Sequence, residues 1–168
     1  MTDGPRESRP HAVRRARPDD LQGVLALLDA DALPRAGVAE AFDHFQVIEV
    51  GGRIVAVAGL EVHGNDGVLR SVAVHPNFRG RAWGSRLTEA AIRSARSAGL
   101  SRLYLLTTTA EDFFPRFGFR RTERDAAPAA IRASVEFAEA CPASAVAMVL
   151  ELRIDRNANS PSDALPAS

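Results

Sequence analysis

One stretch of the chain constrains the fold more than any other, and it runs from Val72 to Gly84 as Val-Ala-Val-His-Pro-Asn-Phe-Arg-Gly-Arg-Ala-Trp-Gly. An apolar strand ends at Pro76, a turn with arginine and glycine follows, and a helix begins near Gly84. A strand that passes through a glycine turn into a helix presents free backbone N–H groups to an anion. The turn is no P-loop, because no Gly-Lys-Ser/Thr closes it, and it lacks the spaced glycines of a dinucleotide fingerprint. The stretch therefore predicts an anion-binding turn of another kind.

Composition narrows the class of protein. The 168 residues, of which 46% are hydrophobic, are enough for one domain with a sizeable core. The 21 basic residues balance 21 acidic ones, so no overall field favours nucleic acid or an anionic membrane as partner. All the basic residues except histidine are arginine, which excludes a Schiff-base lysine. The single cysteine, Cys141, excludes an internal disulfide and a multi-cysteine metal site, and we expect no metal.

The two ends of the chain differ from its middle. Residues 1–10 and 155–168 are polar and contain proline and serine, so we expect disordered tails around one domain at 11–154. No apolar run reaches membrane-spanning length, and residues 1–10 lack the apolar segment of a signal peptide. The sequence therefore predicts a cytoplasmic protein.

Between the tails the hydrophobic pattern alternates between strands and helices. Apolar residues at helical spacing follow Asp19, which we expect to cap the first helix. Further helices are expected at 38–41, 83–98, 110–117 and 128–139, and strands at 11–17, 45–50, 53–62, 68–74, 102–107, 119–123 and 144–152. Three antiparallel strands followed by strand–helix–strand units predict an α/β fold, with a mixed sheet of about seven strands and helices on both faces.

Four segments carry a resemblance to a known family. They are Leu-Arg-Ser-Val-Ala-Val-His-Pro at 69–76, the turn at 79–84, the strand ending Leu-Thr-Thr-Thr at 103–109, and Phe-Phe-Pro-Arg-Phe-Gly-Phe at 113–119. In this order they resemble the GNAT superfamily of N-acetyltransferases over about residues 13–152. The last two segments are similar to its N-acetylglutamate-synthase-like branch, and 125–145 resembles small acetyltransferases associated with arsenic resistance. The resemblance implies a GNAT fold, acetyl-CoA as co-substrate and a small-molecule amine as acceptor.

The resemblance assigns the turn to the pyrophosphate of acetyl-CoA. Backbone N–H groups would hold this anion, and Arg79 and Arg81 would add charge-assisted hydrogen bonds. Ala82 stands where the family has glycine. Because alanine tolerates a left-handed backbone poorly, the loop must use ordinary dihedral angles there or bind less tightly. The expected cofactor-binding residues are Val72, Ala73, Val74, Arg79, Gly80, Arg81, Ala82, Trp83, Gly84, Ser85 and Phe114.

The catalytic residues are less well indicated. The resemblance implies that backbone N–H groups from Val72 to Val74 polarise the thioester carbonyl. Many relatives carry a tyrosine acid at the position of Phe114 and a glutamate base at that of Val68, and neither side chain here can transfer a proton. We therefore expect Val72 and Glu61 to be the catalytic residues, and no side chain to be an essential acid. The alternatives for the base are a bound water and the side chains of His63, His75 and Glu111. The sole tyrosine, Tyr104, lies mid-strand and is expected to be packed.

The acceptor site is predicted from arginine and hydroxyl side chains. Arg35 follows a proline in the break after the first helix, and Arg70 lies on the strand that leads to Val72. Two arginines and nearby hydroxyls suit an acceptor with one or two carboxylates, such as an amino acid or its analogue. Surface or interface salt bridges are the alternative explanation for both arginines. The expected substrate-binding residues are Arg35, Arg70, Ser71, Thr107, Thr108 and Thr109.

Two other functions stay open at this point. One is acetylation of a protein or peptide, and the other is a non-catalytic acyl-CoA-binding sensor, which Ala82, Phe114 and Val68 favour. A homodimer is also possible, because dimers are common in the fold.

Overall fold

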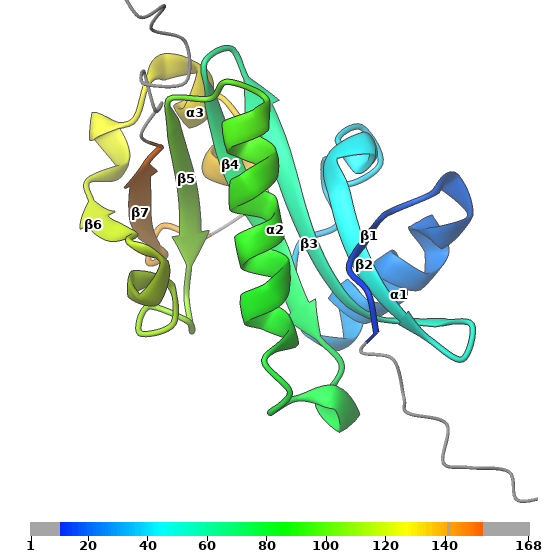
Figure 1. Ribbon diagram of the computed structural model, residues 1–168. Helices are drawn as coiled ribbons and strands as arrows, with labels where there is room; N and C mark the ends of the chain where they lie inside the picture. The colour runs from blue at the N-terminus through cyan, green and yellow to red at the C-terminus, as the bar shows by residue number, and fades with distance from the viewer. Residues whose placement is uncertain (1–10, 141, 153–168) are drawn as a thin grey trace, which may run out of the picture.

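The computed structural model describes residues 11–140 and 142–152 (Figure 1). The tails predicted to be disordered lie outside the described residues, and so does Cys141. The main elements are β1 (Arg14–Arg15), α1 (Leu21–Ala30), β2 (Phe45–Val50), β3 (Arg53–His63), β4 (Asp66–Val74), α2 (Trp83–Ser97), β5 (Arg102–Thr107), β6 (Arg120–Thr122), α3 (Ala129–Arg132) and β7 (Val146–Glu151).

The strands form one sheet of seven, in the order β1-β2-β3-β4-β5-β7-β6. Neighbouring strands are antiparallel except β4 and β5, which are parallel. The prediction of a mixed sheet of about seven strands is confirmed.

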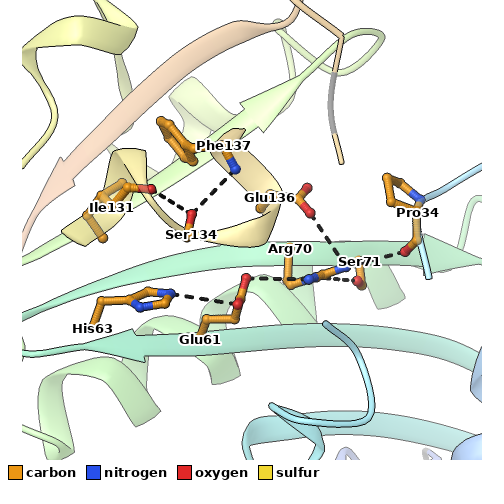
Figure 2. A network of polar contacts seen from close by, with 9 residues as sticks. All are labelled: Pro34, Glu61, His63, Arg70, Ser71, Ile131, Ser134, Glu136 and Phe137. Atoms are coloured by element: carbon orange, nitrogen blue, oxygen red, sulfur yellow. Dashed lines mark hydrogen bonds and ion pairs between the residues drawn. The ribbon is translucent and has the colours of Figure 1, made fainter. Parts of the chain in front are cut away.

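The helices cover both faces of this sheet, as predicted (Figure 1). Successive strand residues point to opposite faces, so Leu69 packs under α2 while its neighbour Val68 packs under the segment around α3. Helix α1 lies on the same side as α3 and buries Val24 and Leu28 against Phe45. Glu61 and Arg70 lie on the face of the sheet that the segment with Ile131 and Glu136 covers (Figure 2).

Several helical boundaries differ from prediction. The helix expected at 128–139 is broken into α3 and a π-helical turn, Glu136–Ala140. Between them the Ser134 hydroxyl donates to the Ile131 carbonyl at 2.6 Å, and such a local bond competes with regular helix. The segment 110–117 forms only a 3₁₀ turn, Phe114–Phe117, and the piece expected at 38–41 is irregular, with a 3₁₀ turn following at Phe42–His44.

The start of the chain also differs. The strand expected at 11–17 shortens to Arg14–Arg15, and Asp19 makes no cap. Instead the Asp20 carboxylate accepts from the Arg17 N–H at 2.7 Å and pairs with Arg14 at 2.7 Å. This pairing with Arg14 lowers the pKa of Asp20 and ties β1 to the first turn of the helical segment.

Candidate active site

Strand β4 contains a bulge close to its C-terminal end. Its register against β3 passes from the pair Gly59–Arg70 to the pair Val57–Ala73, so Ser71 and Val72 together oppose the single residue Ala58. Ser71 adopts φ 58°, a left-handed conformation that is uncommon outside glycine. A bulge leaves its extra residue outside the regular ladder and frees backbone groups at that point. The predicted polarising group, the Val72 N–H, belongs to this bulge.

Beside the bulge, β4 and β5 have separated. Their parallel pairing covers only Asp66–Arg102, Gly67–Leu103 and Val68–Tyr104. Beyond Val68, β4 pairs with β3 alone among the described strands, while β5 continues to pair with β7 as far as Thr107. On its β5 side, the backbone of β4 from Leu69 to Ala73 therefore has no strand partner among the described residues.

The turn after β4 leads directly into the N-terminus of α2. Gly80 has φ 80° and Ala82 has φ 60°, and the first helical hydrogen bond of α2 runs from the Arg86 N–H to the Ala82 carbonyl at 3.0 Å. No side chain caps this helix. The N–H groups of Trp83, Gly84 and Ser85 consequently have no partner within the helix and are oriented to receive an anion.

Of the two alternatives predicted for Ala82, the one with ordinary dihedral angles is excluded, because the residue adopts φ 60° and ψ 22°. The Trp83 side chain is anchored in the core and stacks on Phe78, with ring centroids 5.4 Å apart and planes 15° from parallel. The chain must therefore reverse sharply between Gly80 and Trp83, and the left-handed conformation at Ala82 completes this reversal. Alanine carries the Cβ that makes this conformation cost an L-residue about 1–2 kcal/mol.

Arg79 and Arg81 carry positive charge on this turn. The Arg79 guanidinium pairs with Asp31 at 2.9 Å, and its Nε–H donates to the Val74 carbonyl at 3.2 Å. The Arg81 guanidinium lies 5.3 Å from the Phe78 ring centroid. Positive charge on the turn that leads into these three helical N–H groups suits a pyrophosphate, the anion of acetyl-CoA.

Arg70 forms the centre of a buried polar network (Figure 2). Its side chain is 0% exposed and pairs with Glu61 at 3.4 Å and with Glu136 at 3.5 Å. Its Nε–H donates to the Ser71 hydroxyl at 3.1 Å, and Nη2 donates to the Pro34 carbonyl at 3.3 Å. The charge of Arg70 is thus met by two carboxylates of the protein. Sequence reasoning missed Glu136. It predicted one continuous helix at 128–139 and not the π-helical turn that brings this side chain to Arg70.

Glu61 and His63 lie on one face of β3, as their alternation predicted. The Oε1 atom of Glu61 is 3.6 Å from Nε2 of His63. Both residues border a cavity of about 650 Å³ that Glu40, His44 and Val135 also line. Glu61 is the cross-strand partner of Val68, the position at which many relatives carry the glutamate base. Its carboxylate therefore lies one strand away from that position, on the same face of the sheet.

The other candidates for the base have different partners. His75 accepts from the Asn77 N–H at 3.1 Å through Nδ1, and Glu111 pairs with Arg121 at 2.9 Å on the surface. Tyr104 is packed against Phe137 at a ring distance of 6.4 Å, as expected, and burial raises the pKa of its phenol. Of the carboxylate candidates, Glu61 alone shares the buried network with the bulge (Figure 2).

The remaining predicted residues lie in different surroundings. Arg35 is exposed and pairs with Asp29 at 3.3 Å, in line with the salt-bridge alternative. Thr107 is buried, and its hydroxyl accepts from the Ala110 N–H at 2.9 Å. Thr108 and Thr109 are exposed at the end of β5. Phe114 is buried in the core, with ring centroids 5.0 Å from Phe113 and 5.8 Å from Phe119.

Comparison with known proteins agrees with this geometry. Residues 41–121 match the Acetyltransferase (GNAT) domain. The amino-acid acetyltransferase of Mycobacterium tuberculosis is 36% identical over 133 residues, which cover 73% of this chain and 75% of that relative. The chain belongs to the GNAT acetyltransferase family. The amino-acid acetyltransferase of Edwardsiella ictaluri is 32% identical over 125 residues, and the match spans 69% of this GNAT chain but only 28% of the longer relative.

Solved structures show the same GNAT fold. N-acetylglutamate synthase from Neisseria gonorrhoeae, complexed with coenzyme A and N-acetyl-glutamate, matches with a TM-score of 0.74 at 23% identity, over 88% of this chain and 36% of that one. Rv2747 from Mycobacterium tuberculosis, in complex with CoA, matches with a TM-score of 0.72 at 27% identity, over 84% of this chain and 99% of that one. This GNAT chain is an acyltransferase with acetyl-CoA as co-substrate. In its described part, no helix is both long and apolar enough to cross a membrane.

Proposed function

We propose that this GNAT enzyme transfers the acetyl group of acetyl-CoA to the amine of a small amino acid or amino-acid analogue. The observation that carries the proposal is the bulge at Ser71 and Val72, which lies where β4 and β5 separate and leads into the uncapped N-terminus of α2. Amino-acid acetyltransferases among the relatives support the class of acceptor.

The proposed roles follow the chemistry of direct transfer. The turn and the first N–H groups of α2 bind the pyrophosphate, with Arg79 and Arg81 adding charge. The Val72 N–H donates to the thioester oxygen, where negative charge develops as the amine nitrogen attacks the carbonyl carbon. Glu61 accepts the proton that the amine loses, directly or through one water. The thiolate then leaves without help from a side-chain acid, because Phe114 has no proton to donate.

The proposal does not require an acidic acceptor. Arg35 and Arg70 were predicted to bind carboxylates of the acceptor, and each already has a carboxylate partner within the protein. Thr108 and Thr109 remain proposed contacts of the acceptor, since they are exposed at the end of β5. Ser71 was also predicted to contact the acceptor, but it is buried and its hydroxyl accepts from the Arg70 Nε–H, so we assign it no such contact.

The test is a panel of acceptors with release of the CoA thiol as readout. The panel contains the common L-amino acids, the phosphorus and arsenic analogues of glutamate, and peptides with varied N-termini. We expect turnover with at least one amino acid or analogue and little with peptides. Preferred turnover of peptides would support protein acetylation instead, and acetyl-CoA binding without any turnover would support a sensor.

Glu61→Gln tests the proposed base. Loss of a general base lowers kcat by about 100-fold and removes its limb from the pH profile. Glu111→Gln is the matched control, because that carboxylate lies on the surface in a pair with Arg121. Equal activity of both variants would exclude Glu61 as the base.

Three finer points stay predictions from the sequence. They are a cytoplasmic location, a homodimer and a role in arsenic resistance. Sedimentation of the purified chain tests the second, and turnover of an arsenic analogue in the panel tests the third.

A further inference from the structure

The Arg70 network connects four parts of the fold that are distant in sequence. Arg70 itself belongs to β4, Glu61 to β3, Glu136 to the π-helical turn, and Pro34 to the loop after α1. Gly37 of that loop leaves no room above the guanidinium, because a Cβ placed there would lie 2.9 Å from Nη1 of Arg70. A buried guanidinium with this many partners has one position available to it.

This fixed guanidinium makes one contact with the bulge. The Arg70 Nε–H donates to the Ser71 hydroxyl at 3.1 Å, which is the only side-chain hydrogen bond of Ser71 among the described residues. Ser71 holds φ 58° although it is not a glycine. Such a conformation persists only where surrounding contacts impose it. The hydrogen bond from Arg70 is one contact of that kind.

We infer that Arg70 is a positioning residue for acetyl transfer rather than a ligand of the acceptor. Its Nε–H holds Ser71 in the left-handed conformation, and this conformation sets the direction of the neighbouring Val72 N–H. The inference rests on the proposed role of Val72 in polarising the thioester. Because a donor must point at the position of the developing charge, a small rotation of this peptide unit slows the reaction without weakening the binding of either substrate.

Arg70→Lys tests the hydrogen bond from Nε–H independently of the positive charge. Arg70→Lys keeps a cation between Glu61 and Glu136 but has a methylene in place of Nε–H. We expect kcat to fall about 10-fold, with both KM values and the Kd of acetyl-CoA changed by less than about twofold. Ser71→Ala removes the other half of the same hydrogen bond, so it should lower kcat equally, and the double variant should be no slower than either single one.

Glycine at position 71 provides the decisive comparison. Glycine adopts a left-handed conformation without help from a hydrogen bond. Arg70→Lys combined with Ser71→Gly should therefore recover at least about fivefold in kcat over Arg70→Lys alone. Arg102→Lys is the control, because Arg102 pairs with Asp66 at the other end of β4, and its kcat should match the wild type. Thermal unfolding of each variant shows whether the chain is folded.

A second measurement does not depend on the acceptor. Amide exchange at Val72 should slow when acetyl-CoA is added to the wild type, slow less in Arg70→Lys, and slow fully again in the variant with Gly at 71. Absence of rescue by glycine, or an effect confined to the KM of the acceptor, would overturn the inference and make Arg70 a substrate ligand. A wild type without amino-acid turnover contradicts the proposed function instead, and the exchange measurement then decides the role of Arg70.

Discussion

Glycine usually destabilises a folded protein, but we expect Ala82→Gly to stabilise this one. Ala82 holds φ 60° and ψ 22° at the start of α2. The left-handed conformation costs an L-residue about 1–2 kcal/mol, and glycine removes this cost. Glycine also raises the conformational entropy of the unfolded chain, which stabilises the unfolded state by about 0.4–1 kcal/mol. The free energy of unfolding should therefore rise by about 0.5–1 kcal/mol, which raises Tm by about 1–4 °C in a chain of this size.

Urea and thermal unfolding measure this difference, and Ala98→Gly is the matched control. Ala98 lies at the other end of α2 with φ −77° and ψ −3°, an ordinary conformation in which glycine relieves no strain. Its replacement should lower the free energy of unfolding by about 0.5–1 kcal/mol. The two substitutions, at the N-cap and the C-cap of one helix, thus change the free energy of unfolding in opposite directions.

The affinity for acetyl-CoA tests the same reasoning at the level of function. Because the turn already holds the left-handed conformation, glycine at position 82 should change the Kd of acetyl-CoA by less than about twofold in calorimetry. The reasoning is refuted if Ala82→Gly destabilises the protein as Ala98→Gly does. A Kd that tightens fivefold or more would also refute it, since it would mean that the alanine turn spends most of its time in another conformation.

Three further predictions follow from two buried residues and one partly buried carboxylate. Gly59→Ala should lower the free energy of unfolding by about 1–3 kcal/mol in urea, because a Cβ there would lie 2.8 Å from Cε2 of Phe45, and an unchanged midpoint would contradict the packing. Asp20→Asn should cost about 1.5–3 kcal/mol at pH 7. Pairing with Arg14 lowers the folded-state pKa of Asp20, so the stability it adds is present above its unfolded pKa and is lost as pH falls through the folded pKa; an equal cost at pH 2 would exclude this cause. Tyr104→Phe should leave turnover within about twofold, because the phenol is packed mid-strand, and loss of turnover with intact acetyl-CoA binding would identify it as the missing acid.

Strands were predicted more accurately than helices, for a physical reason. The boundaries of β2 and β5 agree with the predicted ranges to the residue, because apolar runs between clear turns report burial directly. The segment 128–139 also carries helical spacing, yet Ser134 breaks it by donating to the Ile131 carbonyl. A local side-chain hydrogen bond of that kind competes with the regular helix, and the hydrophobic pattern does not report it.

The site was predicted unevenly. The order of strand, turn and helix around Arg79 was placed correctly, since these elements are consecutive in sequence, and the contact of this turn with acetyl-CoA stays a prediction. The network around Arg70 was not foreseen, because its partners Glu61, Glu136 and Pro34 come from three other segments. Arginine on a strand looks the same in sequence whether its partner is a substrate or a carboxylate of the protein.

The sequence by itself determined the order of the elements, the family and the turn that suits acetyl-CoA, because each depends on residues adjacent in the chain. Tertiary structure alone decided three things: the left-handed backbone at Ala82, the bulge at Ser71, and the partners of Arg70. The left-handed conformations of Ala82 and Ser71 depend on contacts with neighbouring segments, which the sequence does not show. Burial of Arg70 is decided by four segments that meet only in the folded protein.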